Sequence, residues 1–277
     1  MRIAKNIKEL NNYTGSNQTI GFVPTMGSLH EGHFSLVKEA ILETPLTVVS
    51  LFVNPTQFND KNDLKNYPRN VEYDLSRLDL ILRKKDIVFI PDEKEIYPEP
   101  DTRTFNFGHL DKIMEGRNRP GHFNGVGQVV SKLFQIVKPT YAFFGEKDLQ
   151  QLAVIRKLVQ MLKIPIIIIG IPIVREPDGL AMSSRNQLLM KNERAEVPKI
   201  FKALTKATRL RGKNTVDEVR NKTIEEINKS QFLSVEYFEI VDEIDLLPIK
   251  NWDVNTNIFG CIAVKAGKIR VIDNIRF

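Results

Sequence analysis

The chain has 277 residues, of which 42% are hydrophobic and 27% charged, and this balance excludes an intrinsically disordered protein. A single cysteine, Cys261, excludes an internal disulfide and a metal site built from cysteines. The net charge of +6 comes from residues 191–222, where ten basic and four acidic residues favour solvated helix faces over a nucleic-acid surface.

The sequence predicts neither a membrane segment nor a secretion signal. The longest uncharged apolar run, residues 164–174, contains two prolines and is shorter than the roughly 20 residues that cross a bilayer. Residues 1–10 are polar and basic, without the apolar core of a signal peptide. We therefore expect a soluble cytoplasmic protein.

Short apolar runs alternate with helical patterns over the first two thirds of the chain. The run at 46–53 is almost entirely apolar, which is typical of a strand buried on both faces of a parallel sheet. The alternation predicts an α/β fold with a doubly wound parallel sheet, in which ligands bind at the carboxyl ends of the strands. Strands are expected at 19–23, 46–53, 86–90, 141–144 and 166–169, and helices at 33–43, 71–82, 126–137 and 149–162.

The pattern changes near residue 175. Two helical stretches precede three strand-like runs, and the last two of these runs are joined by what reads as a hairpin turn. We therefore expect a larger domain over residues 1–175 and a smaller α+β domain over 176–277. The helices are expected at 192–210 and 215–229, the strands at 235–241, 258–265 and 268–272, and the turn at 265–268.

The first predicted strand runs into a segment that holds two of the four histidines of the chain. His30 and His33 are three residues apart at the start of a helix, so both imidazoles can face the same side. Gly27 and Gly32 let a ligand approach the backbone, and a helix N-terminus favours phosphate. Capping histidines and a two-histidine metal site are the alternatives, although no third metal ligand lies at a typical spacing.

Other predicted strands also end in polar residues. Asn54 and Gln57 follow the second strand and offer neutral amides that suit a hydroxyl or a carboxylate, although Asn-Pro is also a common turn. Lys147 follows the fourth strand and can neutralise a phosphate, while Asp148 can accept from a ribose hydroxyl or hold Mg²⁺ through water. Gln151 lies one helical turn beyond Lys147. An ordinary charged first turn of a helix is the alternative for this segment.

Two further loops carry candidate residues. The loop at 117–126, with Arg119 and His122, is a mobile lid, a polyphosphate contact or a surface turn. The segment at 174–186 lies at the expected domain boundary, where a closing element would sit. It contains two serines followed by an arginine, a set that can bind phosphate oxygens as pyrophosphate forms. Taken by itself, this segment is a polar linker.

Five segments between residues 24 and 186 together resemble the pantothenate synthetase (pantoate–β-alanine ligase) family of the nucleotidyltransferase superfamily. In chain order they match the patterns PTMGxLHxGH, FVNPxQF, RPGHFxGV, FGEKDxQQ and DGLAMSSRN. The histidine pair resembles the HIGH-type signature, and Met182 to Arg185 resembles the KMSKS loop. Ala181 replaces the leading lysine of that loop, which argues against an aminoacyl-tRNA synthetase. The C-terminal third carries no motif.

The resemblance implies a Rossmann-like fold of the HIGH-type nucleotidyltransferases, with a C-terminal lid domain. It also implies a reaction in two steps, in which pantoate attacks the α-phosphorus of ATP and β-alanine then attacks the resulting pantoyl adenylate. Pyrophosphate, AMP and pantothenate are the products. ATP as substrate with Mg²⁺, no metal held by the protein, no nucleic-acid or membrane partner, and a cytoplasmic homodimer complete the expectation.

The resemblance also assigns roles to residues. His33 is implied as the proton donor, Asp148 as a ribose contact and Val174 as a backbone contact to adenine. Gln57 and Gln151 are implied to hold pantoate, and Gln57 to help place β-alanine as well. The implied catalytic residues are His30, His33, Lys147, Ser183, Ser184 and Arg185. The implied ATP-binding residues are Met26, Gly27, Ser28, Leu29, His30, Glu31, Gly32, His33, Gly145, Glu146, Lys147, Asp148, Val174, Met182, Ser183, Ser184 and Arg185.

Two other functions remain as alternatives. Another nucleotidyltransferase of this fold, such as a cytidylyltransferase or a phosphopantetheine adenylyltransferase, would need a site for an acceptor phosphate. A nucleic-acid-binding protein without catalysis would need aromatic side chains among the basic residues. Residues 191–222 contain only one, Phe201.

Overall fold

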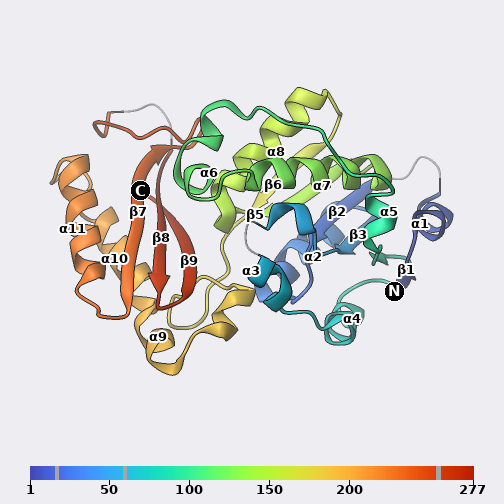
Figure 1. The fold of residues 1–277 in the computed structure, drawn as a ribbon, viewed down its shortest axis with the longest axis horizontal. Helices are drawn as coiled ribbons and strands as arrows, with labels where there is room; N and C mark the ends of the chain where they lie inside the picture. The colour runs from blue at the N-terminus through green and yellow to red at the C-terminus, as the bar shows by residue number, and fades with distance from the viewer. Residues whose placement is uncertain (16–18, 59–60, 254–256) are drawn as a thin grey trace. The chain divides into compact units, whose positions relative to one another are not determined.

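A computed structural model describes residues 1–15, 19–58, 61–253 and 257–277 (Figure 1). The chain divides into two compact units. The first unit comprises Met1–Glu146 and Val154–Pro172, and the second comprises Lys147–Ala153 and Ile173–Phe277. The sequence predicted two domains divided after residue 175, and this domain boundary stays a prediction.

The first unit is built on a parallel sheet with the order β1-β4-β3-β2-β5-β6. All five strands expected in this region are present, so the predicted α/β class with a parallel sheet is confirmed. The sequence did not predict β1, because three residues are too few to show a pattern. The strands are β1 (Arg2–Ala4), β2 (Ile20–Thr25), β3 (Leu46–Leu51), β4 (Ile87–Phe89), β5 (Tyr141–Gly145) and β6 (Ile167–Ile171).

Helices cover both faces of this sheet. Val23, Val49 and Val88 pack into a core with side chains of α2 and α4. On the opposite face, the ring of Phe134 from α7 contacts Phe22 and Phe144 edge to face. The helices are α1 (Ile7–Thr14), α2 (Glu31–Glu43), α3 (Lys61–Asn66), α4 (Val71–Asp79), α5 (Glu93–Ile96), α6 (Met114–Asn118), α7 (His122–Val137) and α8 (Leu149–Leu162).

The direction of winding reverses between β2 and β5. The chain passes from β2 to β3 and β4 on one side, and β5 and β6 lie on the other. Ligands of open α/β sheets bind at such a reversal, beyond the carboxyl ends of the strands. The loop after β2 and the residues after β5 both begin there (Figure 1).

Strand β2 is longer than predicted. It was expected to stop before Pro24, but it continues through Pro24 to Thr25. Proline has no N–H to donate to a neighbouring strand. Since β5 pairs with β2 only at Gly21 and Phe22, that side of the strand has no ladder at Pro24.

The second unit contains an antiparallel sheet with the order β7-β8-β9. Its core is formed by this sheet with α10 and α11. The predicted hairpin turn is present, with Gly267 in the left-handed conformation that glycine tolerates. The elements are α9 (Lys191–Glu196), α10 (Pro198–Thr208), α11 (Val216–Asn228), β7 (Leu233–Asp242), β8 (Ile258–Ala266) and β9 (Ile269–Arg276).

Two predictions for the second unit were wrong in detail. The single helix expected at 192–210 is divided into α9 and α10 at Pro198, which lacks the N–H needed inside a helix and instead begins α10. The last strand was expected to end at 272. It continues to Arg276, because Asp273 and Asn274 pair with Ile262 and Cys261 of β8.

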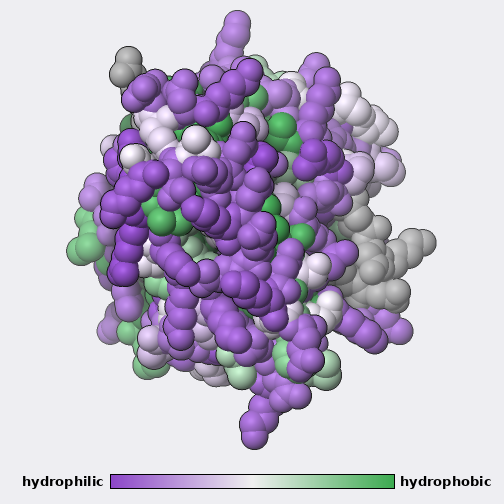
Figure 2. All heavy atoms as spheres, turned by 90° about the vertical axis from the view of Figure 1, so that its left-hand side faces the viewer, coloured by the Kyte–Doolittle hydropathy of each residue, from purple (hydrophilic) through white to green (hydrophobic). Residues whose placement is uncertain are grey.

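The basic stretch lies on exposed faces of α10 and α11. Figure 2, which views the molecule from the side of α11, shows mainly hydrophilic side chains there. Lys206 pairs with Glu226 at 2.6 Å and Arg220 with Asp217 at 3.0 Å, so both signs of charge are interspersed. This arrangement is typical of solvated helix faces. Among the residues that the structure describes, no helix has both the length and the apolar character to cross a membrane.

Candidate functional site

The loop after β2 has a backbone that hydrogen bonds hold in a tight turn. Gly27 and Ser28 both adopt left-handed conformations, with φ of 77° and 53°. The Thr25 hydroxyl donates to the Ser50 carbonyl at 2.7 Å and accepts from the Gly27 N–H at 3.2 Å. The loop is thereby fixed to the end of β3.

A buried carboxylate from α4 completes this loop. Asp74 is 1% exposed, and its two oxygens accept the N–H groups of Ser28 and Leu29, each at 2.8 Å. Burial raises the pKa of Asp74, and these two hydrogen bonds act in the opposite direction. A Cβ at Gly27 would lie 3.0 Å from Asp74 Oδ2, so glycine also allows this close approach. No pattern in the sequence pointed to Asp74, which lies 46 residues from Ser28 on an ordinary amphipathic helix.

We expect Asp74→Asn to weaken ATP binding by about tenfold, because an asparagine turns an NH₂ group toward one of two buried N–H donors and leaves it unpaired. Calorimetric titration with ATP measures this effect. Asp79→Asn is the matched control, since Asp79 on the same helix is 65% exposed and pairs with the N-terminal amine at 3.2 Å. Equal ATP affinity in both variants would contradict a role for Asp74 in shaping the loop.

His30 and His33 both cap the start of α2. The Gly32 N–H donates to His30 Nδ1 at 3.1 Å, and the His30 N–H donates to His33 Nδ1 at 3.3 Å. The alternative that these histidines cap the helix is therefore correct for their Nδ1 atoms, which accept backbone N–H groups. A backbone N–H can only donate, so each Nδ1 is an acceptor and each neutral ring carries its proton on Nε2. The two rings, with centroids 4.1 Å apart, thus present two Nε2–H donors that suit phosphate oxygens.

Two other residues predicted to bind ATP, Met26 and Glu31, differ in how far they are buried. Glu31 is exposed and its carboxylate pairs with Arg77 at 2.8 Å. Met26 is half-buried, and its sulfur accepts from Gln57 Nε2 at 2.7 Å. The structure thus joins the loop after β2 to the turn after β3 through Met26 and Gln57.

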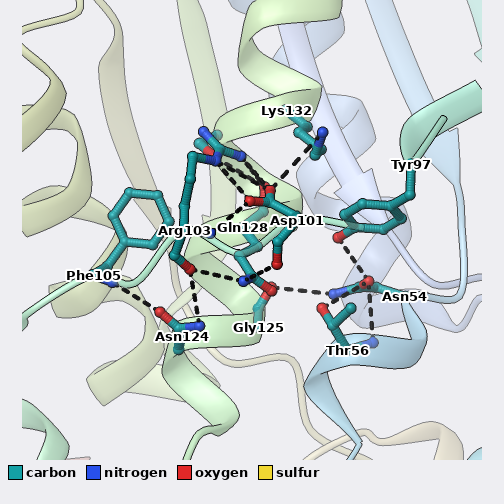
Figure 3. A network of polar contacts seen from close by, with 11 residues as sticks. Asn54, Thr56, Tyr97, Asp101, Arg103, Phe105, Asn124, Gly125, Gln128 and Lys132 are labelled. Carbon is teal, nitrogen blue, oxygen red and sulfur yellow. Dashed lines mark hydrogen bonds and ion pairs between the residues drawn. The ribbon is translucent and has the colours of Figure 1, made fainter. Parts of the chain in front are cut away.

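The turn after β3 is organised around Asn54, which is 1% exposed (Figure 3). Its Oδ1 accepts from the Tyr97 hydroxyl at 2.9 Å and from the Thr56 hydroxyl at 3.2 Å. Its Nδ2 donates to the Gly125 carbonyl at 3.2 Å and to Gln57 Oε1 at 3.4 Å. The sequence offered Asn54 as a candidate amide for binding a ligand. In the structure, its amide forms hydrogen bonds within the protein that stabilise the turn carrying Gln57.

A second set of polar contacts, between the segment 97–103 and α7, lies beside this turn (Figure 3). Gln128 of α7 donates to the carbonyls of Asp101 and Arg103 at 2.9 and 2.8 Å. Hydrogen bonds from Arg103 lower the pKa of Asp101, which also lies 3.9 Å from Lys132. Burial raises the pKa of Tyr97 to about 12, so its hydroxyl stays a donor to Asn54. The segment 97–103 is thus anchored on α7.

The segment after β5 is divided between the two units. Gly145 and Glu146 belong to the first unit, and Lys147 and Asp148 to the second. Lys147 Nζ lies 3.9 Å from Asp148 Oδ1, and the Lys147 side chain is 18% exposed. Gln151 is half-buried near the start of α8.

Within the second unit, β9 forms hydrogen bonds to two segments that were predicted to bind the nucleotide, the one around Lys147 and the one that begins at Val174. Arg175 donates to both oxygens of Asp273, at 2.7 and 2.9 Å, and its guanidinium lies 3.8 Å from the centre of the Phe201 ring. The next residue, Asn274, donates through Nδ2 to the Lys147 carbonyl at 3.1 Å. Burial raises the pKa of Asp273, and the bonds from Arg175 oppose that shift. Asp273 and Asn274 were not among the predicted site residues, and the only sign of them in the sequence is two polar residues next to an apolar strand-like run.

The segment 174–186 folds back on itself. The Met182 N–H donates to the Val174 carbonyl at 3.0 Å, so these two predicted ATP residues lie side by side. Ser183 Oγ accepts the Arg185 N–H at 3.3 Å and caps a short 3₁₀ helix, Ser184–Leu188. The segment is therefore an ordered loop and not a plain linker.

No group of three or more His, Cys, Asp and Glu side chains that could hold a metal ion occurs within the described ranges. The two-histidine metal alternative needs a third ligand of this kind. The donors presented by the imidazole pair suit an anion better than a cation.

Comparison with known proteins gives the family. The sequence model of pantoate-beta-alanine ligase matches residues 2–276. The chain is 49% identical over 281 residues to the pantothenate synthetase of Porphyromonas gingivalis, covering 100% of this chain and 99% of that protein. It is 48% identical to the enzyme of the same name from Bacteroides fragilis, with the same coverage.

Solved structures agree with this result. The crystal structure of pantothenate synthetase from Thermus thermophilus superposes with a TM-score of 0.92 at 39% identity, covering 99% of both chains. Pantoate-beta-alanine ligase from Francisella tularensis, complexed with beta-gamma ATP and beta-alanine, superposes with a TM-score of 0.81 at 38% identity, covering 100% of this chain and 97% of the other. The chain therefore belongs to the pantoate–β-alanine ligase family.

Proposed function

We propose that the chain condenses pantoate with β-alanine at the expense of ATP. The pantoate carboxylate attacks the α-phosphorus, forming an acyl–phosphate bond and releasing pyrophosphate. The amine of β-alanine then attacks the carbonyl carbon of pantoyl adenylate, loses a proton and releases AMP. One observation carries the proposal most directly: two imidazoles whose Nδ1 atoms accept backbone N–H groups stand at the carboxyl end of β2, where the sheet reverses its winding.

Adenylation needs charge neutralisation and in-line positioning more than covalent help from the protein. The donors for developing charge are His30 and His33, with His33 as the proton donor. Lys147 neutralises phosphate charge and Asp148 accepts from the ribose. We assign ATP binding to Met26, Gly27, Ser28, Leu29, His30, Glu31, Gly32, His33, Gly145, Glu146, Lys147, Asp148, Val174, Met182, Ser183, Ser184 and Arg185, of which His30, His33, Lys147, Ser183, Ser184 and Arg185 are catalytic.

Gln57 and Gln151 hold pantoate, and Gln57 also helps to place β-alanine. Neutral amides suit a small hydroxy acid, because they bond its hydroxyls and carboxylate without adding a fixed charge. The contacts of Asn54 support this assignment, since they hold the turn that presents Gln57. An acceptor phosphate, as in other nucleotidyltransferases, would call for a cationic side chain here.

Mg²⁺ enters with ATP as part of the substrate. We further propose that the enzyme is cytoplasmic and forms a homodimer. Strand β6 supports the dimer, because it is an edge strand on which Ile167 is 53% exposed. Light scattering on the purified chain measures the mass directly, and a monomer at micromolar concentration would contradict the dimer.

Exchange of labelled pyrophosphate into ATP tests the reaction. We expect exchange that depends on pantoate and needs no β-alanine, because the first step is reversible and complete without the amine. Exchange with cytidylyl- or phosphopantetheine-type acceptors, and none with pantoate, would favour the alternative nucleotidyltransferase.

We expect Gln57→Ala to weaken pantoate binding by about tenfold and to leave ATP binding nearly unchanged, since it removes one or two hydrogen bonds to the acceptor alone. Calorimetry with each substrate separates the two effects. Gln160→Ala, at an exposed position of α8, is the control. Equal losses for pantoate and ATP would count against the assignment of Gln57.

A further inference from the structure

Two hydrogen bonds at the ring nitrogens of His122 together indicate its tautomer. It is the first residue of α7 and is 6% exposed. Its Nδ1 lies 2.9 Å from the carbonyl oxygen of Gln57, and its Nε2 lies 3.0 Å from Nη1 of Arg119. Burial excludes the surface-turn interpretation for this residue.

The partners of the ring fix its tautomer. A guanidinium has only donors, so Nε2 of His122 must accept from Arg119. A carbonyl oxygen has only lone pairs, so Nδ1 must donate to Gln57. Only a neutral imidazole protonated on Nδ1 satisfies both contacts. This is the opposite tautomer from the one that the contacts of His30 and His33 require.

The series of contacts continues behind Arg119. Glu115 of α6 is 7% exposed, and its Oε2 lies 3.9 Å from Nη1 of Arg119. A carboxylate at this distance favours the charged guanidinium and opposes its displacement. Glu115, Arg119 and His122 therefore form a line of groups that ends at the backbone of Gln57.

Helix α7 also packs directly against the turn that carries Gln57. A Cβ at Gly125 would lie only 2.4 Å from the carbonyl oxygen of Thr56, so glycine permits the close approach. The Gly125 carbonyl in turn accepts from Asn54. Two points one helical turn apart on α7, at residues 122 and 125, thus hold the backbone of the turn.

We propose that His122 is a positioning residue for the acceptor side of the site, with Arg119 setting its tautomer. Its Nδ1–H fixes the carbonyl of Gln57, and this orients the Gln57 amide toward pantoate. The inference rests on the proposed function only in naming pantoate as the ligand of Gln57. It gives a role to Arg119 and His122, to which the family resemblance assigned none.

Nitrogen chemical shifts of ¹⁵N-histidine-labelled protein test the tautomer without any substrate. We expect His122 to show a protonated Nδ1 and an unprotonated Nε2, and the Nε2 signal to shift in Arg119→Met, which removes the donor to that atom. Protonation of His122 on Nε2, or on both nitrogens, at neutral pH would overturn the proposal.

Substrate binding tests the positioning role. We expect His122→Ala to raise the dissociation constant of pantoate by about tenfold, as expected for one lost hydrogen bond, and to leave ATP affinity unchanged. His122→Asn keeps an N–H donor close to the position of Nδ1 and should recover most of the affinity. His109→Ala, at a half-buried histidine of the 3₁₀ turn Gly108–Asp111, is the control.

The outcomes separate the two proposals. Unchanged pantoate affinity in His122→Ala, or equal losses in His122→Ala and His122→Asn, would overturn the positioning role. Wild-type protein that binds ATP but no pantoate would overturn the proposed function and the ligand named here, whatever the tautomer.

Discussion

Replacing His33 by asparagine should lower the rate of pantoyl-adenylate formation by about 10²–10³, the usual loss when one preorganised donor to developing charge is removed. The shorter amide side chain can still accept the His30 N–H, as Nδ1 of His33 does in the native loop at 3.3 Å. It cannot reach outward as the Nε2–H does. The fold and the cap of α2 should therefore survive while the chemistry is lost. Rapid-quench measurement of adenylate in a single turnover gives the rate.

Two further variants define the origin of this loss. His33→Gln extends an amide N–H toward the position of Nε2 and should recover part of the rate. His33→Ala also loses the cap and should cost about 1 kcal/mol of stability besides. A single-turnover rate within a few-fold of wild type in His33→Asn would remove His33 from the mechanism.

The second large effect is on stability. Asp273→Asn should lower the free energy of unfolding by about 3–5 kcal/mol, because it removes the buried negative charge that Arg175, only 18% exposed, pairs with. The native carboxylate binds Arg175 through two hydrogen bonds and is 5% exposed. Denaturant unfolding measures the loss.

Two variants show whether the uncompensated charge is the cause. Glu236→Gln removes a carboxylate that also pairs with an arginine, Arg270 at 2.5 Å, but is 20% exposed, so it should cost less than about 1 kcal/mol. Combining Arg175→Met with Asp273→Leu removes both charges and should recover most of the stability. If Asp273→Asn is no worse than Glu236→Gln, the buried pair does not hold this part of the second unit together.

The sequence predicted the parallel sheet because its central strands, such as β2, β3 and β4, are buried on both faces. All six residues of β3 are buried, and such a run is visible without any structure. The histidine loop was found for the same reason: it follows a buried strand, and parallel sheets present ligands at that end. Local patterns were therefore enough to predict the fold and to propose the histidine loop as a candidate site.

The missed features depend on contacts between distant residues. Asp74 meets the loop after β2 from 45 residues away, and His122 meets Gln57 from 65 residues away. No local period or motif identifies such pairs, since each residue by itself looks like a helix side chain. Asp273 and Asn274 lie just beyond the strand expected at 268–272, where no pattern in the sequence marks them. Their partners, Arg175 and Lys147, lie 98 and 127 residues away in the chain.

The decisive experiment is a crystal structure with pantoate and a non-hydrolysable ATP analogue. We predict an α-phosphate oxygen within hydrogen-bond distance of Nε2 of His30 or His33, with the pantoate carboxylate facing the phosphorus and its hydroxyls bonded to Gln57. A nucleotide bound with its phosphates away from the loop after β2 would show that the imidazole pair does not serve adenylation.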